Sequence, residues 1–392
     1  MSNEVQEVVA ASGGVLRLDA ALVARDWLPP GYRLGLPDDA YDAGERGFIC
    51  ERWLGSTTTA DNRVGPDDEG ISYIRSADGS RLSLAAAVQR APQLILGSEY
   101  ASTHAGLGRL AKIFDFGARL PFHIHPPTDQ AALVGRSSKD EVYYFPSDVD
   151  MGAHPETFFG LHPWIAANKR EDVLLPHLQA WCDDAILRHS FAYQQVAEQG
   201  FYIDSGILHA PGTALTVELQ EDSDTLSMFQ ALNAGQIISK DLLYKDVSTE
   251  DRDTLGERAL MRWVDWEANG DPQFYENRLV APQRITAGPG VVEDWILYGT
   301  SKFSGKRLRL APGARVSTSE RGVYNLLAWR GRGTVGGQPV VGGVPGEDEL
   351  LVVHGAAVKP HEVVNTGEVE LELLKFFGPD INPDAPRAGL EL

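Results

Sequence analysis

A run of three residues, His123-Ile124-His125, constrains the fold of this chain more than any other segment. Successive side chains of a β-strand point to opposite faces, so the two imidazoles lie on one face of a sheet. On its own, such a pair more often consists of two solvated surface histidines. The neighbouring sequence favours a built site, because Gly117 stands six residues before His123 and a second segment, Gly206-x2-His209, follows later in the chain. We therefore expect a β-rich region that presents both imidazoles to its interior.

Two more residues complete a candidate set of metal ligands. Glu141 begins an apolar, strand-like run, and His209 follows the turn glycine Gly206. Three imidazoles and one carboxylate can thus be drawn from three separate strands. This ligand set suits Zn²⁺, with Fe, Mn or Ni as alternatives. The sequence predicts one divalent metal per chain, held by His123, His125, Glu141 and His209.

The spacing around these ligands resembles the two motifs of the cupin barrels. Gly117-x5-His123-x-His125 follows the first motif, and Gly206-x2-His209 follows the end of the second, in the same order. The resemblance implies a double-stranded β-helix, or jelly roll, for this part of the chain.

Composition limits the classes of function that remain. The 40 glycines and 23 prolines are spread along the chain and favour many short strands and turns, hence a mainly β fold. The net charge of −20 argues against nucleic-acid partners and against an anionic membrane surface. No apolar run reaches the roughly 20 residues that span a bilayer, and the polar start Met1-Ser2-Asn3-Glu4 does not read as a secretory signal. We expect a cytoplasmic protein.

At 392 residues the chain exceeds the size at which one core usually keeps growing, so we expect two domains. Residues 1–245 are predicted to form a metal-binding barrel with an N-terminal segment wrapped around it and a helical insertion at about 155–199. Residues 246–275 are predicted to be a helical linker, because Ser248 caps an amphipathic run.

The rest of the chain, residues 276–392, returns to strand patterns and is predicted to be a second, degenerate barrel without a metal. Where a metal-binding barrel carries its histidine pair, this half has Ser317-Thr318-Ser319. His354 and His361 have no partner pair, and we interpret them as loop or rim residues.

Six segments in order resemble the type I phosphomannose isomerases, a family of zinc-dependent cupins, over roughly residues 47 to 230 and more loosely to the end. A cysteine replaces the family's glycine at the start of the first segment. The segments are Cys50-Glu51-Arg52-Trp53-Leu54-Gly55-Ser56, Leu110-Ala111-Lys112-Ile113-Phe114-Asp115, Leu120-Pro121-Phe122-His123-Ile124-His125-Pro126, Lys139-Asp140-Glu141, Ser205-Gly206-Ile207-Leu208-His209-Ala210 and Glu218-Leu219-Gln220-Glu221-Asp222-Ser223-Asp224.

Carried over position by position, the resemblance implies the same four metal ligands, with His123 in place of the family's usual glutamine. It implies Glu218 as the acid/base carboxylate and Lys139 as an active-site lysine. It further implies that Glu51, Trp53 and Lys112 bind substrate. Without the resemblance, Glu218 and Lys139 would read as solvent-facing strand residues.

Met228 is the main departure from the family pattern. The family carries a catalytic arginine about ten residues after the position of Glu218, and here that residue is methionine. Arginine supplies a permanent charge and five donors, suited to an enediolate or a phosphate, and methionine supplies neither. Basic heads lining the cavity would restore a phosphate ligand, whereas acids, amides and aromatic rings would favour a neutral sugar.

We expect a metal-dependent aldose-ketose isomerase that acts on a sugar or sugar phosphate through an enediol. One alternative is another metal-assisted enolising reaction, by an epimerase or lyase, on an unphosphorylated carbohydrate. A second is a carbohydrate-binding cupin that has lost catalysis. The expected partner is a small carbohydrate, and assembly as a homodimer is left open.

Overall fold

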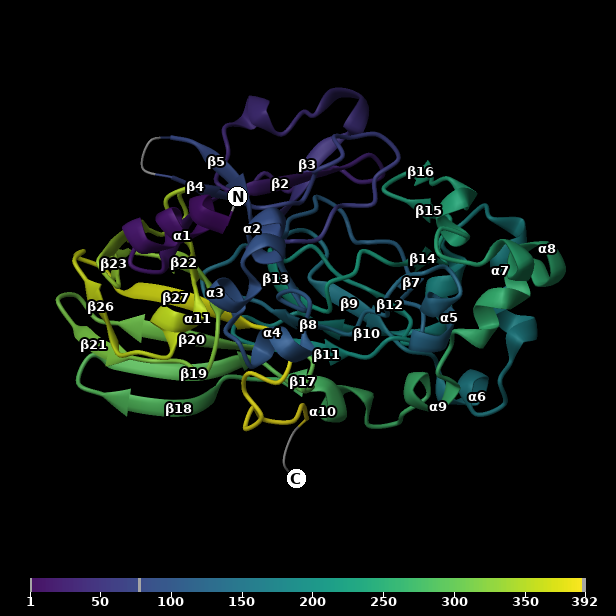
Figure 1. Cartoon of the computed structure of the whole chain (residues 1–392). Coiled ribbons are helices and arrows are strands. Elements are labelled where there is room, and N and C mark those ends of the chain that lie inside the picture. Colours follow the sequence, from purple (N-terminus) through teal and green to yellow (C-terminus); the bar gives the residue numbers. More distant parts are fainter. Residues whose placement is uncertain (1, 77–78, 390–392) are drawn as a thin grey trace.

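The computed structural model describes residues 2–76 and 79–389 and consists of two β-rich halves that lie side by side (Figure 1). The half that carries the histidine pair has two antiparallel sheets. One sheet has the order β17 (Leu279–Val280), β11 (Gly200–Ile203), β8 (Glu141–Tyr144), β13 (Thr216–Gln220), β6 (Leu110–Phe114), β3 (Phe48–Leu54) and β2 (Ala21–Arg25). The other has the order β10 (Phe191–Gln194), β9 (Glu156–Phe159), β12 (His209–Ala210), β7 (His123–Ile124) and β14 (Ser227–Met228).

β13 shows that the longer of these two sheets is buried on both faces. All five of its residues are buried, although apolar and polar residues alternate along it. Val217 and Leu219 belong to the apolar core between the two halves. Glu218 instead lies across from Lys112 on β6 and Tyr143 on β8, so its side chain points into the interior of the first half. The sheet therefore separates an apolar core from a polar interior.

The second half is built on a nine-stranded sheet packed against a four-stranded one. The larger sheet has the order β18 (Gln283–Gly288), β19 (Val291–Leu297), β20 (Ser304–Leu310), β27 (Leu371–Phe377), β22 (Tyr324–Arg330), β25 (Glu349–Val352), β1 (Val15–Asp19), β4 (Tyr73–Arg75) and β5 (Arg81–Ser83). The smaller has the order β21 (Arg315–Thr318), β26 (His361–Asn365), β23 (Arg332–Val335) and β24 (Gln338–Val341). The prediction of a mainly β chain is confirmed.

The expectation that the N-terminal segment only wraps around the barrel was wrong for two stretches. β2 and β3 pair with each other and extend the sheet that carries Glu218. β1 crosses to the second half, where Val15 lies opposite Val352 on β25. Loops join these strands. Pairing of the strands satisfies the backbone N–H and C=O groups that a buried loop would leave without partners.

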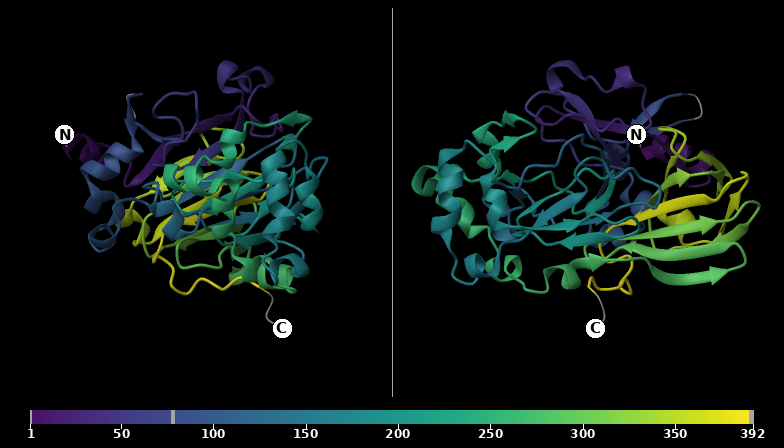
Figure 2. Two further views of the ribbon diagram at one scale, coloured as in Figure 1. Left: turned by 90° about the vertical axis from the view of Figure 1, so that its right-hand side faces the viewer. Right: turned by 180° about the vertical axis from the view of Figure 1, so that it is seen from behind.

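Helices gather at the end of the first half that lies away from the second half (Figures 1 and 2). In the insertion predicted at about residues 155–199, helices occupy the middle. Strands β9 and β10, which pair with each other, lie at its two ends. In the predicted linker, the Ser248 hydroxyl accepts the Asp251 N–H as predicted, and the helix ends at Gly256, whose φ is 56°. The helices at this end are α6 (Pro163–Ala166), α7 (Glu171–Ala180), α8 (Thr249–Leu255) and α9 (Trp266–Asn269).

The remaining helices complete the fold, and those near the N-terminus pack on the second half. They are α1 (Ser2–Ala11), α2 (Leu84–Arg90), α3 (Pro92–Leu96), α4 (Tyr100–Thr103), α5 (Thr128–Ala132), α10 (Phe274–Arg278) and α11 (His354–Ala357). A two-stranded ribbon, β15 (Leu232–Asn233) and β16 (Gln236–Ile237), projects beside α7 and α8 in Figure 1. Within residues 2–76 and 79–389, no helix combines the length and the apolar character needed to cross a bilayer.

Candidate metal centre and active site

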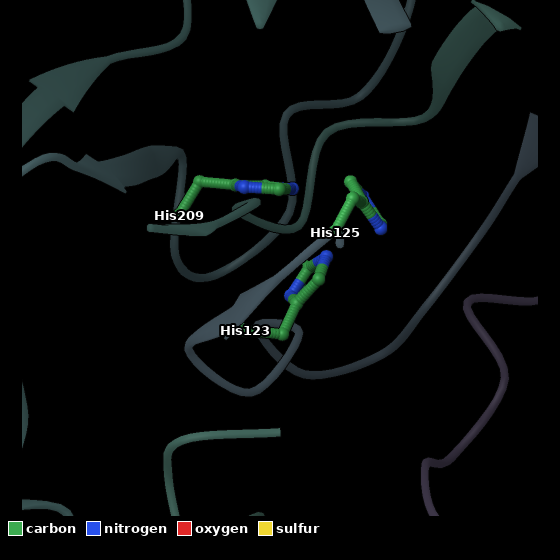
Figure 3. Close-up of side chains that lie close together, drawn as sticks. All are labelled: His123, His125 and His209. Carbon is green, nitrogen blue, oxygen red and sulfur yellow. The ribbon is translucent and has the colours of Figure 1, made fainter. Parts of the chain in front are cut away.

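Three histidines meet inside the first half (Figure 3). His123 on β7 lies directly opposite His209 on β12, and His125 follows at the end of β7. All three side chains are buried, and one nitrogen of each lies within 4.8 Å of the others. The ring centroids of His123 and His209 are 4.1 Å apart. Short strands from different parts of the chain thus bring the imidazoles together as the alternation in the sequence predicted.

Backbone carbonyls fix the orientation and tautomer of all three rings. Each Nδ1 lies at hydrogen-bond distance from a carbonyl oxygen, and because a carbonyl only accepts, each Nδ1 must carry the proton. In this tautomer each Nε2 is left as the acceptor of its ring and lies near the other two. The carbonyl partners are Pro121 for His123 (2.8 Å), Thr225 for His125 (2.7 Å) and Ile207 for His209 (2.9 Å).

Glu141 on β8 faces these acceptors with a carboxylate. Its Oε2 lies 3.3 Å from His125 Nε2, and its Oε1 lies 3.0 Å from His209 Nε2. Both ring nitrogens are buried and have no hydrogen-bond partner among the described residues. Burial lowers the pKa of His125 to about 3 and lowers that of His123 as well, which keeps both rings neutral.

Acceptors that face each other in a buried site repel, and a cation among them removes the repulsion. Among the described residues, the three imidazoles are the cluster whose donor atoms could hold a metal ion, and Glu141 adds a carboxylate oxygen beside them. The residues present therefore fit a divalent metal.

Glu218 and two lysines lie on the other side of Glu141. Lys139 Nζ is 2.9 Å from Glu141 Oε2 and 3.3 Å from Glu218 Oε1, and Lys112 Nζ is 3.4 Å from Glu218 Oε2. Burial raises the pKa of Glu218 to about 8, although both ammonium groups act in the opposite direction. For Lys139, burial disfavours the charge, but the carboxylates of Glu141 and Glu218 outweigh it and raise the pKa. A carboxyl group that can hold or release a proton near neutral pH thus stands beside the acceptor cluster.

A further group of charged side chains lies next to these residues. Arg25, at the end of β2, lies 2.8 Å from Glu51 and 3.1 Å from Asp224, and all three side chains are buried. Lys112 Nζ is 3.7 Å from Glu51. Sequence reasoning missed Arg25, because a single arginine that ends the apolar run Ala21-Leu22-Val23-Ala24 belongs to no motif. The one feature of the sequence that marks Arg25 is that a charged residue directly follows an apolar run.

Trp53 does not contact the cavity. Its ring is fully buried among Ala21, Val23 and Leu110, at one end of the barrel interior. The indole N–H donates to Glu51 Oε2 at 2.7 Å. The expectation that Trp53 binds substrate is thus not supported by its placement, since strand alternation puts it on the same face as Glu51 but beyond the cavity. Its contact orients Glu51 instead.

Several of the other site residues line one small cavity of about 30 Å³. Glu51, Lys112, Lys139, Glu141 and Glu218 all line it, as do Arg25, Asp224 and His123. Met228 also lines it from β14, where it lies directly opposite His123. The half-buried side chains of Trp27, Leu120 and Leu226 contribute to the wall.

Neither a family model nor a curated protein sequence matches this chain. Solved structures do match it over nearly its whole length. The mannose 6-phosphate isomerase from Bacillus subtilis has 13% identity and a TM-score of 0.64, with 93% of this chain and 99% of that chain covered. A single-residue mutant of the phosphomannose isomerase from Salmonella typhimurium has 12% identity and a TM-score of 0.62, with 93% and 100% covered. The resemblance and the cupin fold predicted from the sequence are confirmed at the level of the fold.

Proposed function

We propose, from the premise that the chain has the fold of the phosphomannose isomerases, that it is a metal-dependent aldose-ketose isomerase. The observation that supports this most is that His123 and Glu141, two members of the candidate metal site, line one cavity with Glu218 and Lys139. A metal site alone would suit many cupins. A carboxyl of raised pKa placed 3.3 Å from an ammonium group adds the means to move a proton.

His123, His125, Glu141 and His209 would hold the metal, and this ligand set suits Zn²⁺ best. A bound divalent metal supplies Lewis-acid polarisation of oxygens on adjacent carbons of the open-chain sugar. The hydrogen bonds from the Nδ1 atoms to backbone carbonyls keep the rings oriented for this task.

Glu218 is the proposed base. It removes the proton from C2 of the aldose; the electron pair of that C–H bond forms the C1–C2 double bond, and the π pair of the C1 carbonyl moves to O1, which gives an enediolate. The protonated carboxyl then returns the proton to C1, where the π pair of the C1–C2 double bond forms the new C–H bond while a pair on O2 forms the C2 carbonyl. We assign to Lys139 the transfer of the hydroxyl proton from O2 to O1, which completes the ketose and leaves both side chains in their starting states. Lys112, 3.4 Å from Glu218, and Glu51 beside it would contact the sugar hydroxyls.

A cavity of about 30 Å³ is far smaller than the pockets of roughly 300 to 1,000 Å³ that hold small-molecule ligands, so it must widen before a sugar enters. Trp27 and Leu226 are only half-buried and lie in segments that join strands, so these are the parts of the wall that we expect to move. Closure over the sugar would exclude water from the enediol and strengthen the electrostatic interactions around it.

The direct test is isomerisation by the zinc-loaded protein of a panel of aldoses, ketoses and their 6-phosphates, followed by NMR in D₂O. Aldose-ketose interconversion with solvent deuterium incorporated at C1 or C2 is the expected result. Conversion to an epimer at C2 would favour the alternative in which the proton returns to the same carbon. Binding of sugars without any exchange at C1 or C2 would favour a cupin that has lost catalysis.

A further inference from the structure

We infer that the site selects an unphosphorylated, uncharged sugar, and that Arg25 is the residue that determines this selectivity. The inference rests on the proposed function and deepens it by naming the substrate class. Three basic heads line the cavity, which by number alone would suit a phosphate. The decisive observation is that each of these heads already has carboxylate partners.

All three nitrogens of the Arg25 guanidinium group have acceptors. Its Nε donates to Glu51 Oε1 at 2.8 Å, and its Nη2 donates to Glu51 Oε2 at 3.2 Å and to Asp224 Oδ1 at 3.1 Å. Its Nη1 donates to Asn62 Oδ1 at 2.9 Å and to Asp224 Oδ2 at 3.3 Å. Since a guanidinium group has five N–H donors, none is left for a phosphate.

The partners of Arg25 are themselves held in place. Asp224 Oδ2 accepts the backbone N–H of Asp61 at 2.9 Å, and Glu51 accepts the indole N–H of Trp53 at 2.7 Å. Both carboxylates are buried. A phosphate that took the guanidinium group would leave one of them buried and unpaired, which is costly. The two carboxylates that hold Arg25, called the clamp below, therefore exclude a phosphate dianion from the guanidinium group.

The ammonium groups of the two lysines are already paired with acidic side chains, as the Arg25 guanidinium group is. Lys139 lies between Glu141 and Glu218, and Lys112 lies between Glu218 and Glu51. Counting Asp224, four acidic side chains face three cationic heads in this cavity. These paired groups can still exchange hydrogen bonds with sugar hydroxyls, which donate and accept and bring no charge.

The other residues that line the cavity include no further lysine or arginine. Met228 lies beside His123, and its thioether is at most a weak acceptor. Trp27, Phe114 and Phe116 add aromatic surface that suits the C–H groups of a sugar ring. These features match a ligand with apolar faces and neutral hydroxyl groups.

The test measures binding and turnover of matched pairs by the zinc-loaded protein: mannose against mannose 6-phosphate, and fructose against fructose 6-phosphate. Calorimetry gives the affinities, and the NMR assay gives kcat/KM. We expect each phosphorylated sugar to be at least about tenfold poorer than its neutral counterpart in both quantities, the lower end of what a missing charge-assisted hydrogen bond costs.

Asp224→Asn removes one carboxylate from the clamp and frees donors of Arg25. We expect it to raise the ratio of phosphorylated to neutral sugar affinity by about tenfold or more, and Glu51→Gln serves as a second variant if the first fails to fold. The matched control is Asp241→Asn, whose side chain is 87% exposed and does not line the cavity. Its ratio should stay at the native value.

The outcomes separate this inference from the proposed function. If the native protein isomerises mannose 6-phosphate as well as or better than mannose, isomerase function stands and the inference about Arg25 is overturned. If the native protein binds and turns over neither member of any pair, both fail together. If Asp224→Asn and Glu51→Gln fold but keep the native preference for neutral sugars, Arg25 is not the cause of that preference.

Discussion

Two opposing effects set the pKa of the Glu218 carboxyl group, and this pKa decides whether the group can take up and return a proton. Burial disfavours the carboxylate, while the ammonium groups of Lys112 and Lys139 favour it, and the resulting pKa is about 8. A group with a pKa near the working pH can both take and return a proton, as an isomerisation requires.

Replacing Glu218 by Gln should lower kcat by about 10² to 10⁴, because general acid-base catalysis typically contributes that much. The amide keeps the size of the side chain, so zinc content and melting temperature should stay close to native. Glu45→Gln, at an exposed position, is the control for loss of a carboxylate. Isomerisation at the native rate by Glu218→Gln would remove this residue as the base and make Lys139 the next candidate.

His125→Ala should reduce bound zinc from one ion per chain to almost none, measured by elemental analysis after dialysis. Metal that binds only the folded protein stabilises it by roughly 4 kcal/mol at 1,000 times its Kd, so zinc should raise the melting temperature of the native protein but not of the variant. The exposed His154→Ala is the matched control. Full zinc occupancy in His125→Ala would contradict the proposed ligand set.

The sequence predicted the parts of the site that rest on local spacing. His123 and His125 share a face because strands alternate, and the positions of Glu141, His209 and Glu218 followed from a resemblance that runs along the chain. Arg25 could not be predicted, since its partners Glu51 and Asp224 come from a different strand and from a loop about 200 residues later. Its role depends on these contacts in space and not on its neighbours in sequence.

Among the elements, β27 shows how a buried charge can be accommodated in a strand of apolar residues. Lys375 is fully buried on it, yet its Nζ lies 2.7 Å from both Glu293 and Glu320. Glu320 also pairs with Lys306 at 2.7 Å. Burial would raise the pKa of Glu320, but these two ammonium groups outweigh it and lower the pKa.

Because the folded protein holds Glu320 ionised at a pKa below its ordinary value of about 4.5, the unfolded chain binds more protons as the pH falls through this range. The pair therefore stabilises the fold above about pH 4.5, and this contribution is lost on further acidification. Glu320→Gln should lower the free energy of unfolding by about 3 to 5 kcal/mol at pH 7 and reduce its dependence on pH below 4.5.

Urea unfolding at pH 7 and pH 4 measures both effects. Glu362→Gln, where the side chain is 56% exposed, is the control, and its free energy of unfolding should change little because exposed ion pairs contribute little. An unchanged pH dependence in Glu320→Gln would show that other carboxylates account for the acid sensitivity.

At the scale of the whole molecule, an ion-pair cluster joins the two halves. Arg52 on β3 lies 2.7 Å from Asp348 and 3.0 Å from Glu349 of the second half, with all three side chains buried. The surrounding core combines residues of both halves, among them Val217 and Leu374. The sequence predicted two barrels, but not this shared core, because residues on the outer face of a barrel read as ordinary strand residues.

Arg52→Met should destabilise the protein by about 3 to 5 kcal/mol, since it leaves two buried carboxylates without their cation. Differential scanning calorimetry should show a lower melting temperature and a broader transition as the halves unfold less cooperatively. Arg63→Met, with its side chain 79% exposed, is the control. A native-like transition in Arg52→Met would mean that the apolar core alone couples the halves.

The crossing of β1 into the second half has a consequence for biosynthesis. Val352, the partner of Val15 on β25, leaves the ribosome more than 300 residues after Val15. At 5 to 20 residues per second the wait is on the order of 15 to 60 s. During this time β1 has an unpaired edge, which other nascent chains could join. Assembly of this sheet therefore waits for synthesis of the second half, and chaperones that cover short apolar segments would be most useful while β1 is unpaired.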